Sequence, residues 1–168
     1  MKIAFLDRDG TIVSDYPDQG WSHVIEPEFL PGAREGLESL NAHNFQIIII
    51  TNQYLINEGT ITLEQYNNFT NKMLDQLAQW NIPILDIFYC PHRRDQACNC
   101  CKPKPGMILA ACERYPKIQM ELSILVGNSY TDIALAEQFQ LRSFAIGFDP
   151  MTPRAIRVES LAEIVNYL

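Results

Sequence analysis

Short apolar runs alternate along the chain with stretches in which apolar residues recur every three or four positions. The run at 45–50 is apolar on both faces, as a central strand of a parallel sheet is. The longest aliphatic run is the four consecutive isoleucines at 47–50. We therefore predict strands at 3–6, 45–50, 84–89, 122–126 and 144–146.

The stretches between these runs predict helices. Thr62 and Gln65 form a capping-box pattern, and proline is a favourable first-turn residue at the start of two other stretches. We predict helices from Pro31 to about 41–44, from Thr62 to about Trp80, from Pro105, after Asp132, and over 161–168.

This alternation predicts an α/β protein with a central parallel sheet and helices on both faces. Right-handed crossovers place the C-terminal ends of the strands at one edge, which is where ligands bind in open α/β sheets. The sequence shows no internal repeat and no linker. We therefore expect residues 1–168 to form a single domain with a minimal cap, in which loops alone close the cleft.

Polar side chains gather at this predicted edge. Asp7 and Asp9 follow the first strand and point the same way, because strand side chains alternate between faces, and Gly10 allows a sharp turn. Taken alone, the pair could be two solvated surface acids at a strand end. Further polar groups follow the second and fourth strands or precede the helix at 105, namely Thr51, Asn52, Asn128, Asp132, Lys102 and Lys104.

This set of groups suits phosphoryl transfer. Carboxylate and amide oxygens are ligands for Mg²⁺, and the reaction needs positioning and neutralisation of charge above all. Thr51 offers a hydroxyl donor and Lys102 a point charge for the phosphoryl oxygens. One carboxylate could attack phosphorus, while the other protonates the leaving oxygen and then activates water.

The composition narrows the classes of function. A formal net charge of -7 argues against a nucleic-acid partner, because such proteins carry a basic face. Asp7 and Asp9 interrupt the first apolar run, so it does not read as a signal peptide, and no run reaches the roughly 18 residues of a membrane helix. We expect a cytoplasmic monomer that acts on a small phosphorylated molecule and binds neither nucleic acid nor membrane.

Four of the five cysteines lie within residues 90–101. Clustered cysteines in a chain without an export signal favour a metal over disulfides. Cys-x-His followed by Cys-x-Cys supplies a closed N/S set for tetrahedral Zn²⁺. The alternative is a loop of free thiols. The predicted Zn²⁺ ligands are Cys90, His92, Cys98 and Cys100; Cys101 is left out as an adjacent thiol, and Cys112 is expected in the core.

A long polar segment at 14–31 has no sustained period and is predicted to be a loop. It carries Tyr16, Trp21 and His23, which could stack on or hydrogen-bond to a substrate. A plain surface excursion is the alternative.

Four motifs resemble those of the haloacid-dehalogenase (HAD) superfamily. They are Asp7-Arg-Asp-Gly-Thr-Ile, Thr51-Asn-Gln, Lys102 before Pro-Lys-Pro-Gly-Met, and Gly127-Asn-x-x-x-Asp132. Within the superfamily, the chain resembles the D-glycero-D-manno-heptose 1,7-bisphosphate phosphatases and the related histidinol-phosphate phosphatases. The shared signs include Phe29-Leu-Pro-Gly-Ala33 and Cys90-Pro-His92, and the match runs to about residue 150.

The resemblance implies a Rossmann-like (HAD) three-layer sandwich with a zinc-binding loop at about 90–101 and a substrate loop at about 14–31. It implies that Asp7 forms an aspartyl-phosphate, that Asp9 is the general acid/base, and that Thr51 and Lys102 hold the phosphoryl group. Asp7, Asp9 (through its carbonyl) and Asn128 would bind Mg²⁺. The expected substrate contacts are Asn52, Gln53, Tyr16 and Cys101.

The chain departs from this subgroup at four places. Asn128 stands where the family has an aspartate, so Mg²⁺ affinity should be lower. Ser129 stands in place of a lysine and Cys101 in place of an arginine, and the segment 54–59 lacks a further arginine. Because three cations are absent, the cleft should accommodate a second phosphate less well.

Three functional hypotheses follow. The leading one is a Mg²⁺-dependent phosphatase of a small phosphate monoester, such as the heptose bisphosphate or histidinol phosphate. The second is a binding or regulatory paralogue with weak or no turnover. The third, an end-processing phosphatase on nucleic acid, is disfavoured by the acidic composition.

Overall fold

The computed structural model describes all residues, 1–168, and its centre is a six-stranded sheet in the order β3-β2-β1-β4-β5-β6. All five neighbouring strand pairs are parallel. The strands are β1 (Ile3–Leu6), β2 (Gln46–Asn52), β3 (Ile84–Cys90), β4 (Ile124–Gly127), β5 (Arg142–Ile146) and β6 (Ala155–Val158). The predicted α/β fold with a parallel sheet is confirmed.

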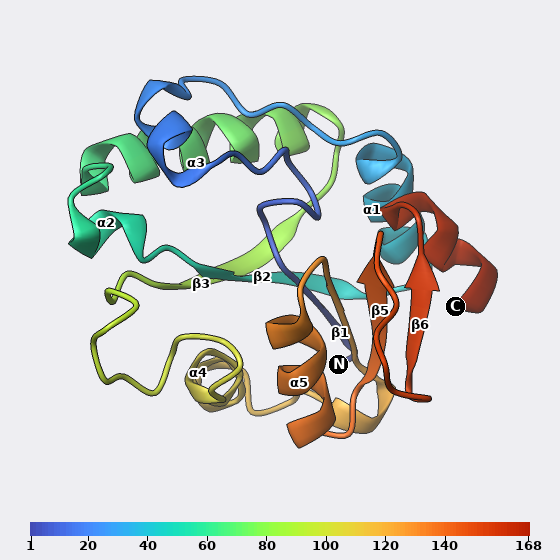
Figure 1. Ribbon diagram of the computed structural model, residues 1–168. Coiled ribbons are helices and arrows are strands. Elements are labelled where there is room, and N and C mark those ends of the chain that lie inside the picture. The colour runs from blue at the N-terminus through green and yellow to red at the C-terminus, as the bar shows by residue number, and fades with distance from the viewer.

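The sheet lies between two layers of helix (Figure 1). The helices are α1 (Ala33–Ala42), α2 (Leu55–Glu58), α3 (Leu63–Gln79), α4 (Gly106–Arg114) and α5 (Tyr130–Gln138), with 3₁₀ turns η1 (Asp18–His23), η2 (Met120–Leu122) and η3 (Leu161–Tyr167). Helices α1, α3 and η3 cover one face, and α4 and α5 cover the other. The chain thus has the three-layer arrangement expected from the alternation of its elements.

Alternation along the central strands divides the core in two. In β1, all four side chains are fully buried. Ala4 and Leu6 pack into the cluster under α1 and α3, whereas Ile3 and Phe5 pack into the cluster under α4 and α5. Because β1 is buried on both faces, its C-terminal end is held rigidly in the middle of the sheet.

The order of the strands creates a crevice at the end of β1. The chain goes from β1 outward to β2 and β3, then returns to place β4 on the other side of β1. Connections therefore leave in opposite directions on the two sides of β1, which is the position where α/β sheets bind ligands.

Several elements differ in their bounds from the sequence prediction. The strand predicted at 122–126 begins at Ile124, because residues 120–122 form η2, and the closing helix is a 3₁₀ helix. Helix α5 begins at Tyr130, before Asp132, because Ser129 and Asp132 form a capping box. Strand β6 was not predicted: it is a four-residue edge strand interrupted by the exposed Arg157, so it gives no apolar run.

The segment 14–31 is folded onto the body of the protein. It contains η1, and an antiparallel bridge joins Val13 to Phe29. Trp21 is buried and packs edge-on against Phe69 of α3, with ring centroids 5.5 Å apart. No helix of the chain has the length and apolar character needed to cross a bilayer.

Candidate active site

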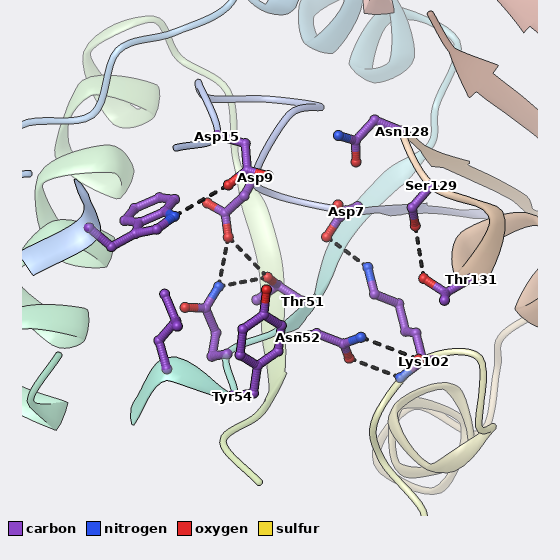
Figure 2. Close-up of a pocket in the computed structure, with 13 residues that line it drawn as sticks. Asp7, Asp9, Asp15, Thr51, Asn52, Tyr54, Lys102, Asn128, Ser129 and Thr131 are labelled. Carbon is purple, nitrogen blue, oxygen red and sulfur yellow. Dashed lines mark hydrogen bonds and ion pairs between the residues drawn. The ribbon is translucent and has the colours of Figure 1, made fainter. Parts of the chain in front are cut away.

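A pocket of about 300 Å³ opens at the C-terminal edge of the sheet, above the end of β1 (Figure 2). Side chains reach it from the ends of β1, β2 and β4, from the loop before α4, and from the segment 14–31. The pocket is lined by Asp7, Asp9, Asp15, Trp21, Thr51, Asn52, Gln53, Tyr54, Leu55, Lys102, Asn128, Ser129 and Thr131. The motifs that lie far apart in the sequence therefore meet in one place.

A buried ionic network forms the floor of this pocket. Lys102 Nζ donates to Asp7 Oδ1 and to Asp132 Oδ1, each at 2.7 Å. The Lys102 side chain is only 3 % exposed and that of Asp132 is fully buried. Asp132 is held in turn by Ser129, whose hydroxyl and amide both donate to Asp132 Oδ2.

The ionic states of Asp7 and Lys102 are shaped by burial and by each other. Burial raises the pKa of the Asp7 carboxyl to about 7; Lys102 acts against this rise, and the charges of Asp132 and Asp9 add to it. Burial alone would lower the pKa of Lys102, but Asp132 and Asp7 raise it above its ordinary value. Lys102 is therefore a fixed positive charge beside Asp7.

Asp9 is held by a different set of partners. Arg8 Nε and Nη2 donate to its two carboxylate oxygens at 2.8 and 3.0 Å, and Gln53 Nε2 donates to Oδ2 at 2.7 Å. Thr51 lies 3.5 Å from the same oxygen. Arg8 is 1 % exposed, and its guanidinium faces the rings of Trp21, Tyr66 and Phe69.

Asn128 faces both acidic residues of the first motif. Its side-chain oxygen lies 3.1 Å from Asp7 Oδ2 and 3.2 Å from the carbonyl oxygen of Asp9; turned over, the amide nitrogen would donate to both. Gly10 allows this approach, because a Cβ there would lie 2.0 Å from Asn128 Nδ2, and the residue has φ +79°. With the amide oxygen inward, three oxygens of different residues face one another with no donor between them. A cation would satisfy all three, and such a donor set fits Mg²⁺, which takes oxygen ligands and keeps several waters.

Asn52 fixes the main chain of the lysine. Its Oδ1 accepts from the Lys102 amide at 2.9 Å, and its Nδ2 donates to the Lys102 carbonyl at 3.3 Å. The end of β2 and the loop before α4 are therefore joined at the residue that carries the charge. Both Asn52 and Gln53 line the pocket. Asn52 positions Lys102, and Gln53 positions Asp9.

Of the four predicted substrate contacts, Asn52 and Gln53 line the pocket, whereas Tyr16 and Cys101 do not. Tyr16 is not among the pocket residues, and its hydroxyl donates to Glu28 at 3.1 Å. Cys101 is not among them either, and its thiol lies 3.7 Å from the Lys102 carbonyl. Asp15 and Tyr54 line the pocket although the sequence analysis did not select them, because neither belongs to a recognisable motif.

The four predicted zinc ligands form a compact cluster beside the site. One ligand atom from each of Cys90, His92, Cys98 and Cys100 lies within 4.8 Å of the others. The Cys90 and Cys100 sulfurs are 2.8 Å apart, and His92 Nδ1 is 3.0 Å from Cys100 Sγ. Three thiols and one imidazole at this separation fit a closed tetrahedral site, the kind in which zinc has a structural role.

The loop at 90–101, which carries the cysteine and histidine cluster, also reaches the rim of the pocket through Arg94. Its guanidinium lies 3.6 Å from the centre of the Tyr54 ring and pairs with Asp18 of η1 and Glu58 of α2. One residue of this loop therefore ties together two segments of the pocket wall.

Comparisons with known proteins agree with this geometry. The family model described as Polynucleotide kinase 3 phosphatase matches residues 2–142. The D-glycero-beta-D-manno-heptose-1,7-bisphosphate 7-phosphatase of Escherichia coli is 35% identical over 161 residues, which is 90% of this chain and 82% of the relative. The D-glycero-alpha-D-manno-heptose-1,7-bisphosphate 7-phosphatase of Photorhabdus laumondii is 38% identical over 146 residues, covering 82% of this chain and 78% of the relative.

Among solved structures, the D,D-heptose 1,7-bisphosphate phosphatase from B. bronchiseptica, complexed with magnesium and phosphate, superimposes with a TM-score of 0.86. The two chains share 26% sequence identity, and the match covers 99% of this chain and 97% of that one. The chain therefore belongs to the polynucleotide kinase 3 phosphatase family and, within the HAD superfamily, to the subgroup of phosphatases that contains the heptose-1,7-bisphosphate phosphatases.

Proposed function

We propose that this protein is a Mg²⁺-dependent phosphatase of a small phosphate monoester and that it works through an aspartyl-phosphate. The observation that carries the proposal is the pairing of Asp7 with a buried lysine on one side and with the Asn128 and Asp9 oxygens on the other. Lys102 neutralises charge on one side of Asp7, and a Mg²⁺ held by the Asn128 and Asp9 oxygens would do so on the other side, as phosphoryl transfer requires.

The residues divide the reaction between them. Asp7 attacks phosphorus and forms the acyl phosphate, while Asp9 gives a proton to the departing alcohol oxygen. Asp9 then takes a proton from the water that hydrolyses the aspartyl-phosphate. This step releases inorganic phosphate and regenerates the Asp7 carboxylate. Lys102 and the Thr51 hydroxyl bind the phosphoryl oxygens. Mg²⁺, held by Asp7, the Asp9 carbonyl and Asn128, would neutralise the charge of the phosphoryl group.

We assign the Cys90, His92, Cys98 and Cys100 cluster to a structural Zn²⁺. The last ligand precedes Lys102 by two residues, so a metal there would fix the loop that delivers the lysine. A closed set of four protein ligands leaves no position for a substrate or a catalytic water.

The test is phosphate release with Mg²⁺ from a panel that contains heptose 1,7-bisphosphate, histidinol phosphate, an aryl phosphate and a 3′-phosphorylated oligonucleotide. Wild type should release phosphate from at least one of the monoesters. Asp7→Asn should lose at least about 10³-fold in kcat, because the amide is not a nucleophile. If the wild-type protein released no phosphate from any of these esters at saturating Mg²⁺, the proposal would be refuted.

A second candidate function rests on Asn128. An amide contributes no negative charge to the metal site, which favours a paralogue with weak turnover that binds a phosphorylated ligand. In that case Asn128→Asp should create or greatly raise activity. Good turnover by wild type, with no gain in Asn128→Asp, would eliminate this candidate.

A further inference from the structure

Arg8 is a buried cation to which the proposed mechanism gives no part, and this inference rests on the proposed phosphatase function. It is the largest of the fully buried side chains, with 1 % of the residue exposed. An arginine keeps its charge in a protein, so its burial costs free energy unless neighbouring groups pair with it and accept its hydrogen bonds. The partners of Arg8 therefore indicate what its charge does.

The hydrogen bonds of the Arg8 guanidinium go to two residues. Nε donates to Asp9 Oδ1 at 2.8 Å and Nη2 donates to Asp9 Oδ2 at 3.0 Å, which makes the pair bidentate. Nη1 donates to the hydroxyl of Thr70, a buried residue of α3, at 3.2 Å. A bidentate pair fixes the orientation of the carboxylate plane, whereas a single hydrogen bond leaves the carboxylate free to rotate.

Three aromatic rings hold the guanidinium in this position. Its central carbon, Cζ, lies 4.9 Å from the centre of the Phe69 ring, 5.3 Å from that of Tyr66 and 5.7 Å from that of Trp21. These three side chains are buried and form an aromatic cage for the cation. Asp9 is the only acidic residue that pairs with Arg8. The guanidinium therefore has neither a second carboxylate nor solvent to turn to.

The two carboxylate oxygens of Asp9 have different numbers of partners. Oδ2 accepts from Arg8 Nη2, from Gln53 Nε2 at 2.7 Å and from the Thr51 hydroxyl at 3.5 Å (Figure 2). Oδ1 accepts from Arg8 alone, so it keeps a lone pair for a proton. A proton moves between heavy atoms about 2.6–3.2 Å apart, so a rotation of the carboxylate would take Oδ1 out of reach of the substrate.

We propose that Arg8 is a positioning residue for the reaction, and that it fixes the Asp9 carboxylate so that Oδ1 delivers the proton to the departing oxygen. The bond from phosphorus to that oxygen breaks, its electron pair stays on the oxygen, and the proton from Oδ1 neutralises it. Arg8 does not line the pocket, so it acts on the substrate only through Asp9. The aromatic cage and Thr70 hold Arg8, so α3 and η1 set the geometry of the acid from behind the site.

The test compares two esters that differ in their need for a proton donor. An alkyl phosphate loses a strongly basic alkoxide, whereas 2,4-dinitrophenyl phosphate loses a stable phenolate that needs no proton. Arg8→Lys keeps the charge but removes the bidentate fork. We expect kcat/KM of this variant to fall by about 10²-fold for the alkyl ester that wild type turns over fastest, and by less than about threefold for the dinitrophenyl ester. This parameter covers only the steps up to departure of the alcohol, so the later hydrolysis of the aspartyl-phosphate does not enter it. Equal falls for both esters would overturn the inference.

Two further variants show whether this loss is specific. Thr70→Val removes the partner of Arg8 Nη1 and changes neither Arg8 nor Asp9, so kcat/KM for the alkyl ester alone should fall, by about three- to tenfold. Arg34→Lys is the matched control, because Arg34 pairs with Glu38 on the surface of α1 and also faces an aromatic ring. It should change kcat/KM for neither ester. If Arg8→Lys did not fold, an effect of Thr70→Val that is absent or equal for the two esters would still contradict the inference.

A crystal structure of Arg8→Lys tests the positioning without turnover, so it decides the inference even if the protein releases no phosphate and the proposed function fails. We expect the Asp9 carboxylate to leave its wild-type orientation and to lose the hydrogen bond from Gln53 Nε2. An Asp9 carboxylate that kept both would show that Arg8 does not position it.

Discussion

The floor and the rim of the pocket are both held by ion pairs, but the two sets differ in burial. On the floor, the side chain of Lys102 is 3 % exposed and that of its partner Asp132 is 0 % exposed. At the rim, Arg94 and Asp18 are 49 % and 44 % exposed. Breaking a buried pair leaves an uncompensated charge, whereas an exposed pair is screened by water. We infer that the floor tolerates one arrangement only, and that the rim can vary.

The largest effect is expected from the floor. Lys102→Met leaves Asp7 and Asp132 buried without their shared cation, so the free energy of unfolding should fall by about 3–5 kcal/mol and phosphate release should be lost. Urea unfolding measures the first quantity. Lys72→Met is the matched control, because Lys72 pairs with Glu26 on the surface. Lys72→Met should change the free energy of unfolding by no more than about 1 kcal/mol. Similar losses in both variants would contradict the difference in stability between the floor and the surface.

Removal of the loop metal should have the next largest effect. Cys98→Ser takes one ligand from the cluster, so we expect a loss of bound zinc and about 2 kcal/mol of stability, or a fall of about 4–8 °C in Tm. Elemental analysis and a thermal scan measure both. Cys112→Ser changes a cysteine outside the cluster and should retain the metal. A full complement of zinc in Cys98→Ser would show that the cluster does not bind zinc as assigned.

A smaller change is expected at the metal position of the floor. Asn128→Asp adds a carboxylate next to Asp7 Oδ2 and the Asp9 carbonyl, so the Mg²⁺ concentration for half-maximal activity should fall by about tenfold. Titration of activity with Mg²⁺ measures it. If Asn128→Asp left the Mg²⁺ concentration for half-maximal activity unchanged, the metal would not be bound at Asn128.

The smallest effect should come from the rim. Arg94→Gln removes the charge that joins η1, α2 and the Tyr54 ring, and KM should rise about three- to fivefold with kcat nearly unchanged. Arg93→Gln is the control, since Arg93 pairs only with the exposed Asp95 of its own loop. A loss of kcat in Arg94→Gln as large as that in Lys102→Met would abolish the contrast between floor and rim.

The floor could be predicted from the sequence because its residues follow buried strands. Asp7 and Asn128 directly follow β1 and β4, and Thr51 lies near the C-terminal end of β2, so the rule that parallel strands end at one edge brings them together. The cysteine cluster could be predicted from its Cys-x-His and Cys-x-Cys spacing together with the family resemblance, and the four side chains do gather in the structure.

The rim could not be predicted in the same way. Asp15, Trp21 and Tyr54 enter the pocket through the path of the segment 14–31 and the short helix α2, which no hydrophobic period reveals. Tyr16 and Trp21 are both aromatic residues of one loop, but only the packing of Trp21 against Phe69 decides which of them lines the pocket. Strand β6 escaped prediction because the exposed Arg157 interrupts its four residues, so they form no apolar run.

The two hydrogen bonds between Asn52 and the main chain of Lys102, one accepted and one donated by Asn52, bear on how the length of the loop around the cysteine cluster can vary. The loop is anchored at both ends, by the sulfur and nitrogen cluster before the lysine and by the contact between the Gly106 amide and the Asn99 carbonyl after it. A Cβ at Gly106 would lie 2.4 Å from that carbonyl oxygen. Insertions and deletions can therefore accumulate between His92 and Cys98 without moving the lysine, while the length of the stretch 99–106 has to stay constant.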